Sequence, residues 1–280
     1  MRHIPLPKDE HSEAFDACLS NMTDQNSIKN LQNSKKYILE AGDIFIEKIN
    51  AGTLSTILPS PIINGIRLKE SMVKLYKDKL SKKGQPGREF YDKWRSISPN
   101  NRCPLCSVQR VYTLDHYLSK ADFPIYAIFP LNLIPACRDC NTEKLSHIAT
   151  KYAEETLHPY FDNIDNDRWL HSKVNETIPA TFSFYVSASP NWNSEMIHRV
   201  NKHMEVFNLH ELFTDHAAEE LSNIILRLNN LFCIGGAEAV RIHLGECLAG
   251  CENANLNSWR SATYRAMYKS TWFHSNGHQV

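Results

Sequence analysis

The chain has 280 residues, of which 42% are hydrophobic and 22% charged, values that are ordinary for a globular protein and that exclude wholesale disorder. Lys and Arg number 31, as do Asp and Glu, so net charge excludes no class of partner and a nucleic-acid surface would need local segregation of charge. No stretch approaches 18 apolar residues, and the first residues carry no apolar run. We therefore expect no membrane span, no signal peptide and a cytoplasmic location.

The N-terminal part of the chain is expected to be helical. Between Lys35 and Ile49, six apolar residues recur at the spacing of a helix with one buried face: Tyr37, Ile38, Ala41, Ile44, Phe45 and Ile49. Pro59-Ser60-Pro61 then predicts a break. Residues 1–100 are expected to form an N-terminal helical region.

A basic segment runs from Arg67 to Arg95, with ten basic residues against four acidic ones. Its first part predicts a helix with an apolar stripe, Gly84–Gly87 a turn, and Arg88–Arg95 a second short helix. A lysine-rich helix is most often a solvated face. The alternative is contact with the phosphates of a nucleic acid, and the sequence leaves both open.

Two Cys-x-x-Cys pairs lie 30 residues apart, and they are Cys103/Cys106 and Cys137/Cys140. A two-residue gap lets both thiolates of a turn face one ion, and two such turns complete a tetrahedral site. Structural disulfides are disfavoured in the cytoplasm, and neither pair has a redox-active context. We therefore predict a structural zinc, because four protein ligands leave no position for water or substrate.

The segment between and just after the two pairs carries the residues that suggest chemistry. It contains Leu114-Asp115-His116-Tyr117, then Asn132-Leu133 before the second pair, and Asn141-Thr142-Glu143-Lys144 directly after it. Imidazole takes up a proton near neutral pH. A carboxylate and an amide oxygen are hard ligands that suit Mg²⁺ or Mn²⁺. Because neighbouring strand residues point to opposite faces, Asp115 and His116 reach one site only where the strand is bent or bulged.

The order Asp-His, Asn-Leu and Cys-Asn-x-x-Lys, framed by two Cys-x-x-Cys pairs, resembles the HNH (ββα-metal) endonuclease family in its zinc-stapled form. The resemblance covers about 45 of the 280 residues. It implies a β-hairpin followed by a helix around a catalytic divalent ion, Mg²⁺ or Mn²⁺. Asn141 stands where the family has either His or Asn, which is a departure from the literal His-Asn-His lettering.

Site residues carry over from the resemblance position by position. It makes Asp115 and Asn141 ligands of the catalytic metal, His116 the general base, and Asn132 the residue that holds the loop and orients the base. Lys144 would face the phosphate, and Arg138 and Lys120 are further candidate substrate contacts. For His158, downstream of the site, both packing against the site and an auxiliary phosphate or metal contact remain open.

The C-terminal part is expected to be mainly helical. Residues 180–188 alternate as in a strand. Helices are predicted over 215–232, 236–251 and 258–273, the first with an apolar face that includes Ala218. We interpret the aromatic residues of the last helix as core. A base-stacking platform is the alternative.

The sequence thus predicts a mostly helical α+β protein with a central ββα-metal core at 101–165, between helical regions at 1–100 and 166–280. The resemblance implies an endonuclease that prefers DNA, with RNA as the other substrate. It extends to nucleases of prokaryotic anti-phage defence, including the Septu type, and so implies a partner ATPase. The alternative is a catalytically silent, zinc-stapled nucleic-acid-binding or adaptor module, which would have no use for His116.

Overall fold

The protein is described by a computed structural model that covers residues 1–144 and 147–279. Within these residues it is mostly helical, with three two-stranded antiparallel sheets, which confirms the expected mostly helical α+β class. The chain forms two compact units, Met1–Asn163 and Ile164–Val280. In the described part, no helix is long and apolar enough to cross a lipid bilayer.

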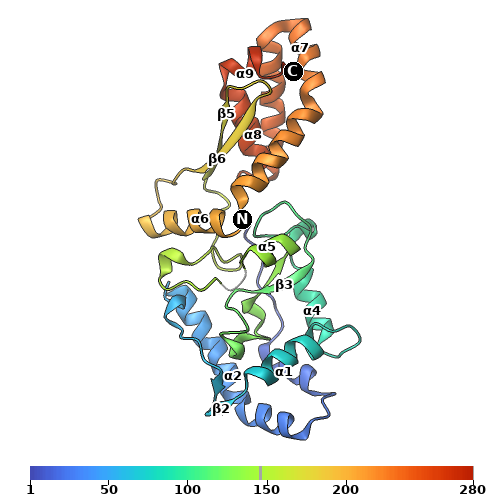
Figure 1. The fold of residues 1–280 in the computed structure, drawn as a ribbon, viewed down its shortest axis with the longest axis vertical. Helices are drawn as coiled ribbons and strands as arrows, with labels where there is room; N and C mark the ends of the chain where they lie inside the picture. The colour runs from blue at the N-terminus through green and yellow to red at the C-terminus, as the bar shows by residue number, and fades with distance from the viewer. Residues whose placement is uncertain (145–146, 280) are drawn as a thin grey trace. The chain divides into compact units, whose positions relative to one another are not determined.

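The first unit begins with two helices, α1 (His11–Leu19) and α2 (Gln25–Asn50) (Figure 1). Asp24 caps α2 by accepting a hydrogen bond from the Asn26 amide at 3.2 Å. The buried stripe of α2 includes Ile38, Ala41 and Phe45, as predicted. Two residues of the predicted stripe, Tyr37 and Ile44, are instead 49% and 47% exposed, because the buried face continues through Leu31 and Ser34 on the same side.

The basic segment forms α3 (Lys69–Lys74), a π-type turn η2 (Leu75–Leu80) and α4 (Arg88–Arg95). A short hairpin, in which β1 (Ile62–Ile63) pairs with β2 (Ile66–Arg67), precedes α3. The apolar stripe of the basic segment is buried, and several of the segment's charges are paired within the protein. Arg88 binds Asp92 through two hydrogen bonds of 2.9 Å, and Lys93 pairs with Glu89 and Asp9. Part of this basic charge is therefore already balanced internally.

A hairpin followed by a short helix occupies the centre of the first unit. Strand β3 (Thr113–His116) pairs with β4 (Leu133–Ala136) in antiparallel register, with Asp115 opposite Ile134 and His116 opposite Leu133. Helix α5 (Arg138–Lys144) follows β4 directly. Short 3-10 turns connect the remaining segments of the unit: η1 (Leu54–Thr56), η3 (Pro99–Asn101), η4 (Pro124–Tyr126), η5 (Pro130–Asn132) and η6 (Tyr152–Glu154).

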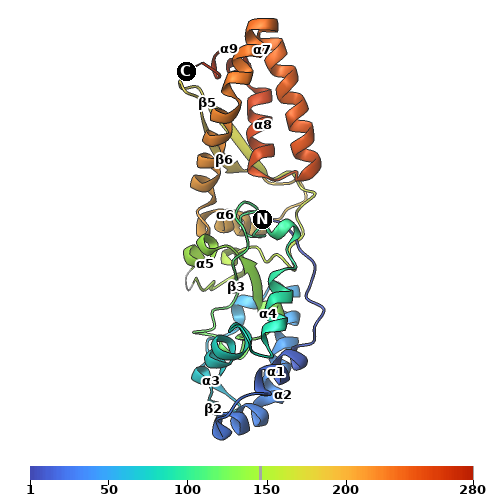
Figure 2. The ribbon, with the colours of Figure 1, turned by 90° about the vertical axis from the view of Figure 1, so that its right-hand side faces the viewer.

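The N-terminal helices and the hairpin share one hydrophobic core. Leu114 and Leu133 of the hairpin belong to the same buried cluster as Leu75, Tyr76 and Trp94, and Figure 2 shows α4 beside β3. Residues 1–100 and the expected central core are thus parts of a single unit. The hairpin is held from behind by helices that lie outside the segment with the recognisable motif.

The second unit contains a hairpin and four helices: β5 (Leu170–Asn175), β6 (Thr181–Val186), α6 (Ser194–Val206), α7 (Leu209–Ala254), α8 (Trp259–Lys269) and α9 (Thr271–Asn276). The predicted strand at 180–188 corresponds to β6. The helices predicted over 215–232 and 236–251 form one element with non-helical backbone at Gly235 and Gly236. The prediction for Ala218 is wrong. It is exposed, and the buried face runs through Phe213, Ala217, Leu221 and Leu228.

Candidate active site

Four buried cysteines form a cluster that is suited to a metal ion. The sulfur atoms of Cys103, Cys106, Cys137 and Cys140 all lie within 4.8 Å of one another. A tetrahedral zinc with bonds of about 2.3 Å requires sulfur separations of about 3.8 Å, so the set fits a structural zinc. The cluster joins the loop before β3 to the start of α5 and so fixes the two ends of the hairpin.

Backbone amides surround the cysteine cluster as they do around thiolates. The Gln109 amide lies 3.4 Å from the Cys106 sulfur, and the Cys140 amide lies 3.3 Å from the Cys137 sulfur. Hydrogen bonds among the thiols lower the pKa of Cys106 and Cys137, whereas burial raises the pKa of Cys103 and hydrogen bonds raise that of Cys140.

Asn132 is fully buried and fixes the loop that follows β3. Its Oδ1 accepts from the Leu118 amide at 2.7 Å, and its Nδ2 donates to the carbonyls of Leu118 and Tyr126 at 3.0 and 3.1 Å. The hairpin ladder is regular through Asp115 and His116. The Tyr117 amide still donates to the Asn132 carbonyl at 2.8 Å, and the strand leaves the ladder at Leu118, whose amide donates to the Asn132 side chain instead. The bend expected at the Asp-His pair is therefore not found there, because the ladder is regular through both residues.

The His116 ring is buried, with one nitrogen fixed by the backbone. Its Nε2 lies 2.9 Å from the Ala127 carbonyl oxygen, next to the residue that Asn132 holds. Because a carbonyl only accepts, Nε2 carries the proton and Nδ1 keeps the lone pair of the neutral ring. Burial and the charge of Lys120 hold the pKa of His116 well below its usual value. The ring packs edge-on against Tyr76 of η2, with centroids 4.3 Å apart.

Asp115 and Lys144 form a buried ion pair between β3 and α5. The Lys144 Nζ lies 3.0 Å from Asp115 Oδ2 and also donates to the His116 carbonyl oxygen. The two side chains are 6% and 12% exposed, so both charges are largely removed from water. The ammonium that was expected to face a phosphate is thus directed at the carboxylate that was expected to bind metal.

Lys120 brings a second positive charge to the same place. Its Nζ lies 5.4 Å from the centre of the Tyr76 ring, and its charge acts on both Asp115 and His116. Burial lowers the pKa of Lys120, while the Asp115 carboxylate opposes that shift. The carboxylate of Asp115 therefore lies beside two ammonium groups, those of Lys120 and Lys144. This excess of positive charge near His116 favours the binding of an additional negative charge.

The remaining predicted site residues lie on α5. Asn141 is exposed and lies three residues before Lys144, on the same side of the helix. Among the residues the structure describes, its side chain makes no hydrogen bond with Asp115. Arg138, at the first position of α5, is also exposed, and its guanidinium carbon lies 3.7 Å from the centre of the Tyr112 ring. The structure therefore brings Asp115, Lys120 and Lys144 together, and the charges of both lysines also act on His116. Asn141 and Arg138 lie on the exposed surface of α5.

The donor set does not fit a catalytic Mg²⁺ or Mn²⁺ ion as it is arranged. Such ions prefer several oxygen ligands. Here the carboxylate of Asp115 is already neutralised by Lys144. Across the described chain, the four cysteines are the one group of three or more His, Cys, Asp or Glu side chains placed to share an ion. A divalent ion at Asp115 would require the Lys144 ammonium to move away.

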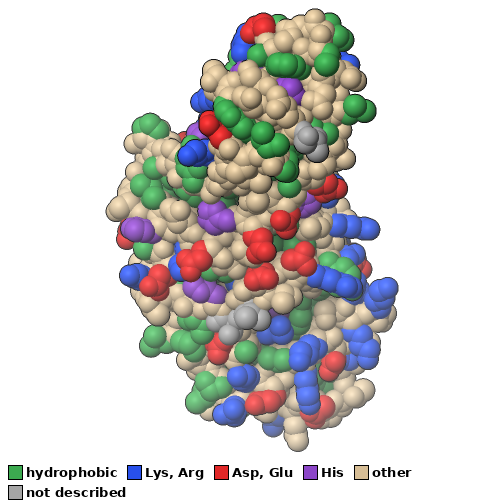
Figure 3. Space-filling view, turned by 45° about the horizontal axis from the view of Figure 1, so that its top comes forward, with side chains coloured by type: hydrophobic (Ala, Val, Ile, Leu, Met, Phe, Trp, Pro, Cys, Tyr) green, Lys and Arg blue, Asp and Glu red, His purple; other side chains and the backbone are tan. Residues whose placement is uncertain are grey.

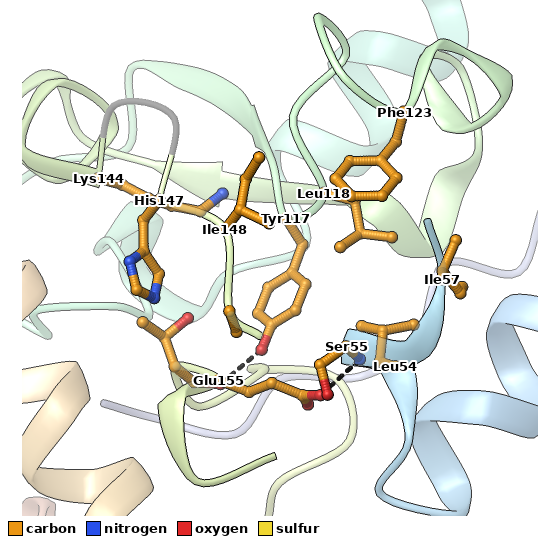
Figure 4. Close-up of a pocket in the computed structure, with 12 residues that line it drawn as sticks. Leu54, Ser55, Ile57, Tyr117, Leu118, Phe123, Lys144, His147, Ile148 and Glu155 are labelled. Atoms are coloured by element: carbon orange, nitrogen blue, oxygen red, sulfur yellow. Dashed lines mark hydrogen bonds between the residues drawn. The ribbon is translucent and has the colours of Figure 1, made fainter. Parts of the chain in front are cut away.

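A small cavity borders the site on the α5 side. Figure 4 shows Lys144 extending past Tyr117, whose hydroxyl donates to the Thr156 carbonyl at 2.6 Å. Glu155 accepts a hydrogen bond from the Ser55 amide at 2.8 Å on the opposite wall. The cavity volume is about 30 Å³, room for about one or two water molecules. A nucleotide does not fit inside it.

His158 is buried behind the hairpin. Its Nε2 lies 3.1 Å from the Leu131 carbonyl oxygen, and its ring lies 4.4 Å from that of Tyr117. These contacts favour a packing role over an auxiliary phosphate or metal contact.

Three partners of the predicted residues carry no signal in the sequence that would identify them. Tyr76 lies in the apolar stripe of the basic segment, and nothing in that pattern indicates its contact with the His116 ring. The Ala127 carbonyl has no side-chain signature at all. Tyr112 precedes β3, and only the Arg138 contact distinguishes it from other surface tyrosines.

Comparison with known proteins gives one relative without a stated activity. No family model matches the chain, and no solved structure matches it. The chain is similar to a protein of Escherichia phage lambda named Protein ea31, with 29% identity over 240 residues, which covers 82% of this chain and 81% of that protein.

Proposed function

We propose that the chain is an HNH-type endonuclease that hydrolyses phosphodiester bonds, with DNA as the preferred substrate and His116 as the general base. The observation that carries this proposal is the His116 hydrogen bond to the Ala127 carbonyl. Because the carbonyl only accepts, the proton of the neutral ring is on Nε2, and the lone pair of Nδ1 can take a proton from water. His116 follows Asp115 in a hairpin that the four-cysteine cluster joins to a helix, the arrangement that the motif implies.

The surroundings of His116 support hydrolysis of an anionic substrate. Phosphodiester cleavage builds negative charge that must be balanced, and positive side chains in a site shielded from water do this effectively. Lys120 and Lys144 lie beside the single carboxylate, Asp115. In this account His116 removes a proton from the attacking water, the lysines offset the charge on the phosphate, and Asn132 keeps the loop that orients the ring in place.

The two metals of the proposal have different support. The four cysteines fit a structural zinc, which would hold the hairpin against α5 without touching substrate. A catalytic Mg²⁺ or Mn²⁺ bound by Asp115 and Asn141 is implied by the motif alone, and the ion pair with Lys144 opposes it. The requirement for a divalent ion is therefore part of the test.

The test is cleavage of supercoiled plasmid by the zinc-loaded protein, with Mg²⁺, with Mn²⁺ and with neither, and with single-stranded RNA as the second substrate. The proposal expects conversion of supercoiled plasmid to nicked or linear forms. Plasmid that stays intact under every condition, while the protein is folded and contains zinc, would contradict it.

A catalytically silent nucleic-acid-binding or adaptor module is the second candidate. The observations that favour it are the neutralised carboxylate of Asp115 and the deep burial of His116. The two candidates differ in their use of His116. An adaptor keeps its binding and its biological activity when His116 is replaced by Ala, whereas a hydrolase loses cleavage.

The resemblance to defence nucleases further suggests an ATPase partner. We include this partner in the proposal, and its test is whether the tagged protein co-purifies with an ATPase from the cells that naturally produce it. A stable monomer that is fully active alone would contradict it.

A further inference from the structure

Arg138 stacks on the ring of Tyr112, and its hydrogen-bond donors remain unused. The guanidinium carbon lies 3.7 Å from the ring centre, Tyr112 is 54% exposed, and Arg138 is exposed as well. Among the described residues, no hydrogen bond or ion pair involves the Arg138 guanidinium. Stacking uses the face of the guanidinium and leaves its N–H edges directed outward, which is the geometry that binds phosphate through two hydrogen bonds.

The position of this pair is fixed by the zinc-stapled frame. The Tyr112 amide donates to the Ala136 carbonyl at 2.8 Å and so extends the hairpin by one residue. Arg138 follows Cys137 directly. Both partners are therefore attached to the most constrained part of the unit, and little side-chain freedom remains to be lost when a ligand binds.

Two further arginines adjoin the pair. Arg95 of α4 donates from Nη1 to the Tyr112 carbonyl at 3.4 Å. Arg110 is exposed and precedes Tyr112 by two residues, which places it on the same face of the extended segment. Acidic side chains are present as well: Asp92 pairs with Arg95 at 3.6 Å, and Asp139 follows Arg138. Lys and Arg side chains gather along the lower right of the view in Figure 3.

We propose that the arginine surface formed by Tyr112, Arg138, Arg95 and Arg110 binds the sugar–phosphate backbone of the nucleic-acid strand that enters the site. This inference rests on the proposed function, because it takes the scissile phosphate to lie at Asp115 and His116. Tyr112 precedes Asp115 by three residues, a distance of about 10 Å along an extended strand. The arginine surface is therefore close enough to contact backbone phosphates that neighbour the cut.

The test measures binding separately from cleavage. A fluorescent DNA duplex of about 20 base pairs is titrated with the His116→Ala protein, without added Mg²⁺ or Mn²⁺, at several salt concentrations. Arg138→Gln, placed in this background, is expected to weaken binding several-fold and to lower the slope of log K against log salt by about one. Adding Arg110→Gln is expected to lower the slope by about one more.

Arg241→Gln is the matched control. Arg241 also lies over a tyrosine, Tyr268, at 5.7 Å, but its Nε and Nη2 donate to Glu238 and its Nη1 donates to the Tyr268 hydroxyl, so each of its nitrogens already has a partner. Tyr112→Phe keeps the stacking ring and is expected to bind like the parent, whereas Tyr112→Ala releases the arginine and binds more weakly. Equal affinities and equal salt slopes for Arg138→Gln and Arg241→Gln would overturn the proposal.

Different results would overturn the arginine surface and the proposed hydrolase. Plasmid cleavage together with binding that is indifferent to Arg138 would overturn the arginine surface and leave the hydrolase intact. Binding that depends on Arg138, in a wild-type protein that never cleaves, would support the arginine surface and identify a binding module.

Discussion

The ammonium of Lys144 lies 3.0 Å from the carboxylate of Asp115, and both side chains are almost completely buried. One partner comes from the end of α5 and the other from β3, so the pair links the helix to the hairpin. It also makes the chemistry of Asp115 depend on where Lys144 lies. The carboxylate is free to bind a cation from solution only when the ammonium has left it.

Removing Lys144 is expected to destabilise the first unit strongly. In Lys144→Met the Asp115 carboxylate stays buried without its partner, and such a change costs about 3–5 kcal/mol in the free energy of unfolding. Asp115→Asn combined with Lys144→Met removes both charges and should recover most of this loss. Urea denaturation at constant zinc measures the difference. A loss below about 1 kcal/mol in the single variant would show that the pair is open to water.

A divalent cation is expected to replace the missing ammonium. Mn²⁺ that binds the bare carboxylate of folded Lys144→Met stabilises that state by mass action, so its melting temperature should rise with Mn²⁺ more than that of the wild type. The Asp115→Asn/Lys144→Met protein is the control and should not respond. Equal responses of wild type and Lys144→Met would contradict competition between the ammonium and the ion.

The four-cysteine cluster is expected to hold one zinc ion on which the first unit depends. Cys137→Ser removes one of the four sulfurs, and a structural zinc contributes directly to folding. The variant should lose the metal and the cooperative unfolding of the first unit. Metal analysis together with thermal unfolding measures both effects. Cys233→Ser changes an exposed thiol of the second unit and should retain one zinc per chain. Full zinc content in Cys137→Ser would contradict the site.

His11 is expected to make the first unit less stable in acid. Its two ring nitrogens are buried, with no hydrogen-bond partner among the described residues, and the ring lies 5.1 Å from that of Phe129. Burial lowers its pKa to about 4. The unfolded chain therefore binds more protons between pH 6.5 and 4, so this contribution is present above pH 6.5 and is lost as the pH falls.

The size of the His11 effect is at most about 3 kcal/mol. Denaturation at pH 7 and at pH 4.5 measures it as the difference between the wild type and His11→Gln, because all other titrating groups are common to both. His198→Gln, at an exposed position, is the control. The same loss of stability in the wild type and in His11→Gln would contradict the prediction.

The sequence predicted those parts of the site that local patterns encode. Spacing alone identified the four cysteines, and the structure places their sulfurs together. Helix α4 has the predicted limits, because Gly87 and the residues before it form a turn. Strand β5 was missed because Leu170–Asn175 is rich in polar residues and is defined by its pairing with β6, which no local pattern reveals.

The sequence could not reveal which groups contact the site residues, for a similar reason. The sequence identified Lys144 as a residue that faces the site. Whether its ammonium pairs with Asp115 or points into solvent depends on how α5 packs on β3. The ring of His116 is fixed by a backbone carbonyl eleven residues later, and carbonyls are the same in every sequence. Side-chain identity therefore located the site, whereas tertiary packing decided which atoms are free to react.

The most direct test of the account compares nicking of supercoiled plasmid by the wild type, His116→Ala and Arg241→Gln, each shown to be folded and to contain zinc. General base catalysis by a positioned side chain contributes about 10²–10⁴-fold to a rate. The account predicts a loss of this size in His116→Ala and wild-type rates in Arg241→Gln. Cleavage by His116→Ala at the wild-type rate would contradict the assignment of His116 as the base.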